Sequence, residues 1–311
     1  MTSSKPQAYR EEVVRFGQDD ALTGILSIPV LEQTELSSQP VLILGAGIIH
    51  KVGPSRVSVE VARFLASQGH TVLRFDLSGI GDSHRPRIPA LDDAVTADIH
   101  AAIGYLDKAA GKGGGLVLVG FCSGADNAFS VAGSAPRVSA VAMFDPTVHR
   151  TRGFHGRSLL ARLTSMRSWI NLLSGRGVWA RIRTRSGSDD SRPPGYYGLL
   201  VKDPAETDRH AAQLVASGVH LLYCMSGAAH RYCNSPRQIE ESLPTGYSEE
   251  FISVAWRPDL DHILSRPEQQ VAFCQVLANW MQSISLKEPP GRLGSTGVSI
   301  EPNRRKPGSK S

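Results

Sequence analysis

The chain has 311 residues, of which 41% are hydrophobic and 20% are charged, and its formal net charge at pH 7 is +5. This length and apolar content are ample for one large α/β domain or two small ones. No apolar run approaches the roughly 20 residues of a membrane-spanning helix, and the first residues lack the apolar segment of a secretion signal, so we expect a cytoplasmic protein without a membrane partner.

The cysteine and glycine spacings indicate no bound cofactor. The four cysteines are scattered, with no CxxC pair and no spacing typical of metal ligands, so neither a disulfide framework nor a zinc site is expected. Gly79 and Gly81 follow a predicted strand, but the third glycine of a dinucleotide-binding fingerprint is missing. We therefore expect reduced thiols, no metal and no cofactor.

Apolar strands alternate with amphipathic helices along most of the chain. The first two strands are separated by a turn at 17–20, which predicts a hairpin. Strands are expected at 9–16, 21–28, 41–44, 71–76, 116–119, 138–144, 220–225 and 251–256, and helices at 57–68, 91–110, 123–132, 205–217, 236–243 and 267–283. Strands and helices that alternate with short connections predict a mostly parallel sheet covered by helices on both faces.

Residues 148–202 interrupt this alternation and predict an inserted helical cap. Nine arginines and no acidic residue lie between Arg150 and Ser188. These arginines indicate either a solvated helix face or a patch that attracts an anionic acyl carrier or an acidic glycan. Nucleic-acid binding is not favoured, because few aromatic residues lie among the arginines. The predicted organisation is an α/β core at 1–147 and 203–284, the cap at 148–202, and a disordered basic tail at 285–311.

A Gly-x-Cys-x-Gly pattern lies between an apolar strand and a helix, at Gly120 to Gly124. In a nucleophile elbow, small residues two positions before and after the reactive side chain permit the sharp turn that lifts it above the sheet edge. Cys122 is therefore our candidate nucleophile. Ser123 is an alternative, although Phe121 would then occupy a crowded position of the turn. A second alternative is that Cys122 is an inert buried thiol.

Three stretches together resemble the α/β-hydrolase fold. Residues 74–83, Arg-Phe-Asp-Leu-Ser-Gly-Ile-Gly-Asp-Ser, resemble the signature that follows its fourth strand, and residues 120–124 occupy its elbow. His262, preceded by Asp261 and followed by a proline-initiated helix, resembles its late catalytic histidine. The resemblance covers about 9–283, and with residues 49–56 it looks closest to serine-aminopeptidase-like and exosortase-associated hydrolases.

The resemblance implies a catalytic triad of Cys122, His262 and an acid. The acid of the family usually follows the penultimate strand, but residues 226–232 contain no carboxylate. Asp145, at the end of the strand after the elbow helix, fits an alternative placement known in this fold. A cysteine–histidine pair without a strong acid is also open, since a thiolate needs less activation than an alkoxide. The alternative acids are Asp259 and Asp261.

By the same analogy, the backbone N–H groups of Ser123 and Gly47 would form an oxyanion hole for the negative charge of a tetrahedral intermediate. His50 and Lys51 follow Gly47 in the same loop. They are candidates for contacting substrate at the mouth of the pocket, and could equally be solvated loop residues.

These features predict an acyl hydrolase that forms an acyl-cysteine on an ester or thioester substrate. The substrate would be a small molecule or a carrier-bound acyl group, with an anionic carrier among the options. Two alternatives stay open: an acyltransferase or cyclase that uses the same cysteine, and a catalytically silent scaffold that binds a ligand or partner.

Overall fold

A central sheet organises the part of the chain that the structure, a computed structural model, describes, namely residues 8–30, 39–84, 90–111, 114–164, 199, 203–242 and 250–285. Eight strands pair in the order β1-β2-β4-β3-β5-β6-β7-β8. Their bounds are β1 Tyr9–Phe16, β2 Leu22–Pro29, β3 Val41–Leu44, β4 Val72–Phe75, β5 Leu116–Phe121, β6 Val138–Phe144, β7 His220–Ser226 and β8 Ile252–Arg257. The pairs β1–β2 and β2–β4 are antiparallel, and the others are parallel.

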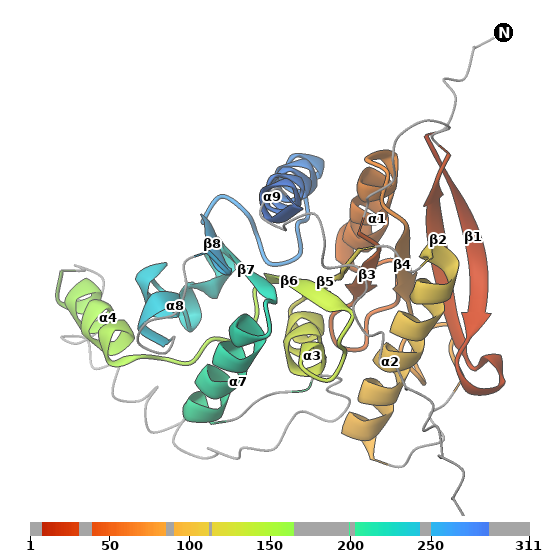
Figure 1. The fold of residues 1–311 in the computed structure, drawn as a ribbon. Coiled ribbons are helices and arrows are strands. Elements are labelled where there is room, and N and C mark those ends of the chain that lie inside the picture. Colours follow the sequence, from red (N-terminus) through yellow and green to blue (C-terminus); the bar gives the residue numbers. More distant parts are fainter. Residues whose placement is uncertain are drawn as a thin grey trace, which may run out of the picture.

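Helices cover both faces of this sheet (Figure 1). One face carries α1 Val57–Ser67 and α9 Pro267–Ser285, and the other carries α2 Leu91–Ala110, α3 Ser123–Ala132 and α7 Pro204–Ala216. The remaining helices are α4 Arg152–Thr164, α8 Arg237–Ser242 and the short 3₁₀ helices η1 Gln18–Asp20, η2 Pro54–Arg56 and η3 Gly227–Arg231. No helix within the described ranges is both long and apolar enough to cross a bilayer.

Two apolar cores, one on each face, explain the uninterrupted apolar runs of the central strands. In β3, Leu42 packs into the core beneath α2 and α3, whereas Val41 and Ile43 pack into the core beneath α1 and α9. Successive side chains of a strand point to opposite faces, so a strand that is covered on both sides must be apolar throughout. The parallel strands β3, β5, β6 and β7 all deliver their following loops to the same edge of the sheet.

The predicted fold class is confirmed, including the leading hairpin and the long helix at Leu91–Ala110. The elbow strand extends to Phe121, because Gly120 and Phe121 still pair with β6. Of the predicted cap, residues 165–198 and 200–202 lie outside the described residues, and so do residues 286–311 of the predicted tail. The division into core, cap and tail stays a prediction.

Candidate active site

Cys122 occupies a strained turn between β5 and α3. Its backbone has φ 51° and ψ −120°, a conformation that residues with a side chain rarely adopt and that costs about 1–3 kcal/mol. Two backbone hydrogen bonds hold the turn: Cys122 N–H donates to Phe144 O at 2.9 Å, and Ala125 N–H donates to Cys122 O at 2.8 Å. The thiol is partly exposed at the sheet edge, whereas Ser123 is 1% exposed.

The two glycines of the elbow are required by close backbone contacts. A Cβ atom on Gly120 would overlap the backbone of Gly124 and Ala125. A Cβ atom on Gly124 would overlap the carbonyl oxygens of Leu44 and Gly45, at the end of β3. Gly-x-Cys-x-Gly is therefore a packing requirement of this turn, which brings the end of β3 against the first turn of α3.

His262 and Asp145 form a short hydrogen bond. His262 lies in the loop between β8 and α9, and its Nδ1 is 2.7 Å from Asp145 Oδ2. Asp145 follows β6 directly, is 3% exposed, and also accepts from the backbone N–H and the hydroxyl of Ser226 at 2.7 and 2.6 Å. Of the three carboxylates proposed as the acid, Asp145 is the one hydrogen-bonded to His262.

The alternative acids are engaged elsewhere. Asp259 accepts two hydrogen bonds from Arg257, at 2.6 and 2.9 Å. Asp261 accepts from Ser265 Oγ at 2.6 Å and from the backbone of Ile263 and Ser265. Both carboxylates therefore accept hydrogen bonds from neighbouring residues in or beside the loop that precedes α9.

His262 lines the same cavity as Cys122. The pKa of His262 is raised from 6.5 to about 10, first because its ring hydrogen-bonds Asp145 and second because it interacts with the Cys122 side chain. With Nδ1 held by Asp145, Nε2 is the ring nitrogen left for proton exchange with the thiol.

The raised pKa of His262 predicts a pH-dependent contribution to stability. The folded state holds the His262 proton more tightly than the unfolded state does, so its contribution is full below about pH 6.5 and is lost as the pH rises through about 10. We expect the difference in unfolding free energy between the native protein and His262→Gln to shrink over this interval. Urea unfolding at several pH values measures it, and a difference that grew with pH would contradict the ion pair.

Two residues that the sequence analysis did not single out contact the acid. Ser226, the last residue of β7, fixes both oxygens of the Asp145 carboxylate. Tyr232 is half-buried, its hydroxyl is 3.5 Å from Asp145 O, and burial together with the charge of Asp145 raises its pKa. Ser226 ends the strand next to β6, but a single hydroxyl has no sequence pattern that would indicate this contact.

The two predicted oxyanion donors lie close together. Gly47, with φ 53°, donates its N–H to Ser123 Oγ at 2.5 Å. Ser123 is the first residue of α3, where backbone N–H groups have no partner within the helix. In this structure the Gly47 N–H is engaged by the Ser123 hydroxyl, so the role of both N–H groups as oxyanion donors stays a prediction.

An apolar cavity of about 330 Å³ opens beside the thiol. Its described lining comes from the loop after β3, the elbow, and the loop that carries His262. The lining residues are Ala46, Gly47, Ile48, Ile49, Pro54, Val57, Phe121, Cys122, Ser123, His262, Ile263 and Leu264. The cavity is therefore bordered by the candidate nucleophile, the candidate base and the two residues predicted to supply the oxyanion hole.

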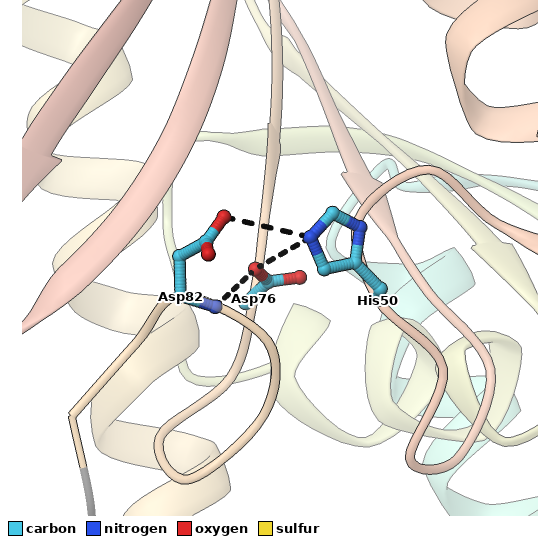
Figure 2. Close-up of side chains that lie close together, drawn as sticks. All are labelled: His50, Asp76 and Asp82. Atoms are coloured by element: carbon cyan, nitrogen blue, oxygen red, sulfur yellow. Dashed lines mark hydrogen bonds and ion pairs between the residues drawn. The ribbon is translucent and has the colours of Figure 1, made fainter.

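Lys51 lies in a buried ion cluster and not among the described residues that line this cavity. Its side chain is 5% exposed, and its Nζ is 2.8 Å from Asp76 Oδ2, 2.5 Å from Asp82 Oδ2 and 3.2 Å from His50 Nε2. Figure 2 shows the other three side chains directed toward one another. The predicted contact of His50 and Lys51 with substrate stays a prediction, since the Lys51 ammonium here neutralises the fully buried Asp76.

The side chains of His50, Asp76 and Asp82 could hold a metal ion, since their ligand atoms lie within 4.8 Å of one another. The Lys51 ammonium is within hydrogen-bonding distance of all three and supplies the positive charge that a metal would bring. The cluster instead ties the loop after β3 to the loop after β4, because Lys51 N–H and Asp82 N–H both donate to Asp76.

Comparison with known proteins agrees with this architecture. A family model described as alpha/beta hydrolase fold matches residues 40–180. Proline iminopeptidase from Mycobacterium smegmatis has a TM-score of 0.53 at 14% identity, over 90% of this chain and 100% of that one. The chain has the α/β-hydrolase fold. Naproxen esterase from Bacillus subtilis shares this α/β-hydrolase fold with a TM-score of 0.53 at 13% identity, over 89% and 92% of the two chains.

The esterase domain of a Rhodothermus marinus protein is a third structure similar to this α/β-hydrolase fold, with a TM-score of 0.51 at 17% identity over 88% of this chain and 98% of that one. No curated protein matches in the sequence comparison. The region that the family model matches contains the elbow and Asp145, whereas His262 lies beyond it. The resemblance drawn from the sequence is thus supported for the fold, whereas the subgroup and the cysteine nucleophile stay predictions.

Proposed function

We propose that this protein hydrolyses ester or thioester bonds through a covalent acyl-cysteine on Cys122. The observation that carries the proposal is the hydrogen bond from His262 to Asp145, with His262 and Cys122 lining the same apolar cavity. A nucleophile, a base in contact with it and a third group that orients the base are the arrangement typical of covalent acyl transfer.

In the first half of the reaction, the Cys122 thiolate attacks the carbonyl carbon of the substrate. A carbon–sulfur bond forms and the carbonyl electron pair moves onto oxygen, where the N–H groups of Ser123 and Gly47 stabilise the charge. As the tetrahedral intermediate collapses, the bond to the leaving group breaks, and His262 gives that group the proton that it accepted from the Cys122 thiol. The acyl group stays on sulfur, and Asp145 holds the ring in place.

In the second half, water attacks the acyl-cysteine and His262 accepts the proton of the water. The second tetrahedral intermediate expels the sulfur, so that the carboxylic acid leaves and the Cys122 and His262 pair returns to its starting state. The names of two structural neighbours, naproxen esterase and an esterase domain, are in keeping with this chemistry.

The other three thiols are poor candidates for acylation. Cys224, Cys233 and Cys274 are each at most 3% exposed. Burial raises the pKa of these thiols to about 12, 11 and 12, respectively, so the thiolate form is scarce at neutral pH. Selective chemistry at the partly exposed Cys122 is therefore the expectation.

Intact-mass measurement after incubation with 4-nitrophenyl butyrate tests the proposal. We expect one butyryl group per chain, placed on Cys122 by peptide mapping and removed by hydroxylamine as a thioester is. His262→Ala should slow its formation, since the proton acceptor is lost. A butyryl group on Ser123, or no adduct and no nitrophenol release, would contradict the proposal, whereas turnover only with an added alcohol or amine would favour acyl transfer to that acceptor.

A further inference from the structure

We infer that the acyl group carried by Cys122 is an uncharged, apolar chain, and that Ile48 and Ile49 bind it. The inference rests on the proposed function, because it assigns the substrate class of the same site. The cavity beside the thiol is lined on one side by the loop that follows β3 and on the other by the loop that carries His262. Apart from Cys122 and His262, no described lining residue has a side chain that titrates.

Two described charged side chains near this cavity already have partners. Lys51, in the same loop as Ile49, is buried against Asp76 and Asp82. Asp261, the residue before His262, accepts hydrogen bonds from Ser265 and Ile263. Apart from His262, which Asp145 holds, the described lining offers a terminal carboxylate or ammonium on the acyl group no partner of opposite charge, and an unpaired charge there is costly. Charged acyl groups are therefore disfavoured.

Exposed isoleucines gather at the mouth of this cavity. Ile48, Ile49 and Ile263 are 67%, 41% and 46% exposed, although large apolar side chains gain free energy when they are buried. They flank Cys122 from two loops that are far apart in sequence. An apolar chain that entered from the mouth would cover them, which a small polar substrate would not do.

The acyl chain, and not the leaving group, is the occupant that this geometry favours near Ile48 and Ile49. These residues directly follow Gly47, whose N–H is a predicted donor to the carbonyl oxygen. The carbonyl carbon is bonded to both that oxygen and the acyl chain. This carbon stays bonded to Cys122 Sγ after the leaving group has departed. Ile48 and Ile49, which line the cavity between Gly47 and Cys122, are thus expected to lie beside the acyl group and not beside the leaving group.

A series of 4-nitrophenyl esters from acetyl to octanoyl tests the inference. Burial of each methylene stabilises a complex enough to raise kcat/KM by up to about fourfold, so we expect a rise of at least about tenfold across the series. The glutaryl monoester should react at least about tenfold more slowly than the pentanoyl ester, which has the same number of carbons and no charge. A flat or falling profile, or a preference for glutaryl, would overturn the inference.

Two variants that each replace an apolar side chain with aspartate distinguish an effect at the cavity from an effect of added surface charge. Ile49→Asp should flatten the chain-length profile, because a carboxylate at the cavity wall opposes an apolar chain. Val13→Asp introduces the same charge on β1, at the far edge of the sheet, where the side chain is 73% exposed, and should keep the native profile. An unchanged profile in Ile49→Asp would also overturn the inference. If the inference about the acyl chain fails while a butyryl group still appears on Cys122, the proposed function stands. If the proposed function itself fails, no ester gives an acyl-cysteine.

Discussion

Replacement of Cys122 with alanine is expected to lower kcat for 4-nitrophenyl butyrate by about 10⁴-fold or more, to the rate that binding and the oxyanion donors alone support. The sulfur is the only group in this scheme that bonds to the substrate, so its removal eliminates both halves of the reaction. Steady-state kinetics with purified protein measures the loss, and circular dichroism checks that the fold is kept.

Matched variants make this result specific to one thiol. Cys274→Ala makes the same chemical change in α9, where the side chain is 3% exposed, and should keep the native rate if the protein folds. Ser123→Ala should keep the acyl-cysteine, since the nucleophile and the backbone N–H of residue 123 both remain. If Cys122→Ala retained more than a tenth of the native activity, another nucleophile or a non-covalent route would have to account for it.

Replacement of Lys51 with methionine is expected to lower the free energy of unfolding by about 3–5 kcal/mol, the cost of leaving one member of a buried ion pair without its partner. Asp76 is fully buried, and Lys51 is the cation that contacts it most closely. Methionine preserves most of the volume of the side chain, so the loss reports charge and hydrogen bonding more than packing. Urea unfolding at neutral pH, followed by circular dichroism, measures the change.

The partners of Lys51 offer an internal control for this prediction. Lys51→Met combined with Asp76→Asn should be more stable than Lys51→Met alone, since the orphaned charge is removed as well. Asp82→Asn should cost much less, because the Asp82 side chain is 64% exposed and water can replace the contact. A double variant less stable than both single variants would show that the cluster acts through its hydrogen bonds and not through charge.

The elbow and its context could be predicted from the sequence because they leave local patterns. A strand covered on both faces appears in the sequence as an uninterrupted apolar run. The spacing of the glycines at 120 and 124 is fixed by the geometry of one turn. The placement of Asp145 could only be proposed among alternatives, because the pairing of an acid with His262 depends on how two distant loops meet. The structure favours Asp145, since it hydrogen-bonds His262 while Asp259 and Asp261 are held locally.

The contacts of Ser226 and Lys51 could not be predicted for a physical reason. Each depends on the order of strands in the sheet: β7 lies beside β6, and β4 lies beside β3, although other elements separate these strands in the chain. A hydroxyl at the end of a strand, or a lysine in a loop, looks like an ordinary solvated residue until its neighbour in the sheet is known. The buried Lys51 is the clearer case, since a lysine is almost never fully buried unless it is paired.

The construction of the elbow also bears on how the chemistry of this scaffold could change over evolution. The tight contacts at the turn involve the backbone and the hydrogen atoms of Gly120 and Gly124, while the side chain of residue 122 is partly exposed beside the cavity. The turn therefore constrains where the side chain of residue 122 lies but not whether the proposed nucleophilic atom is sulfur or oxygen. Exchange between thiol and hydroxyl chemistry requires one substitution at this position, whereas any residue larger than glycine on either side would require the sheet and helix to separate.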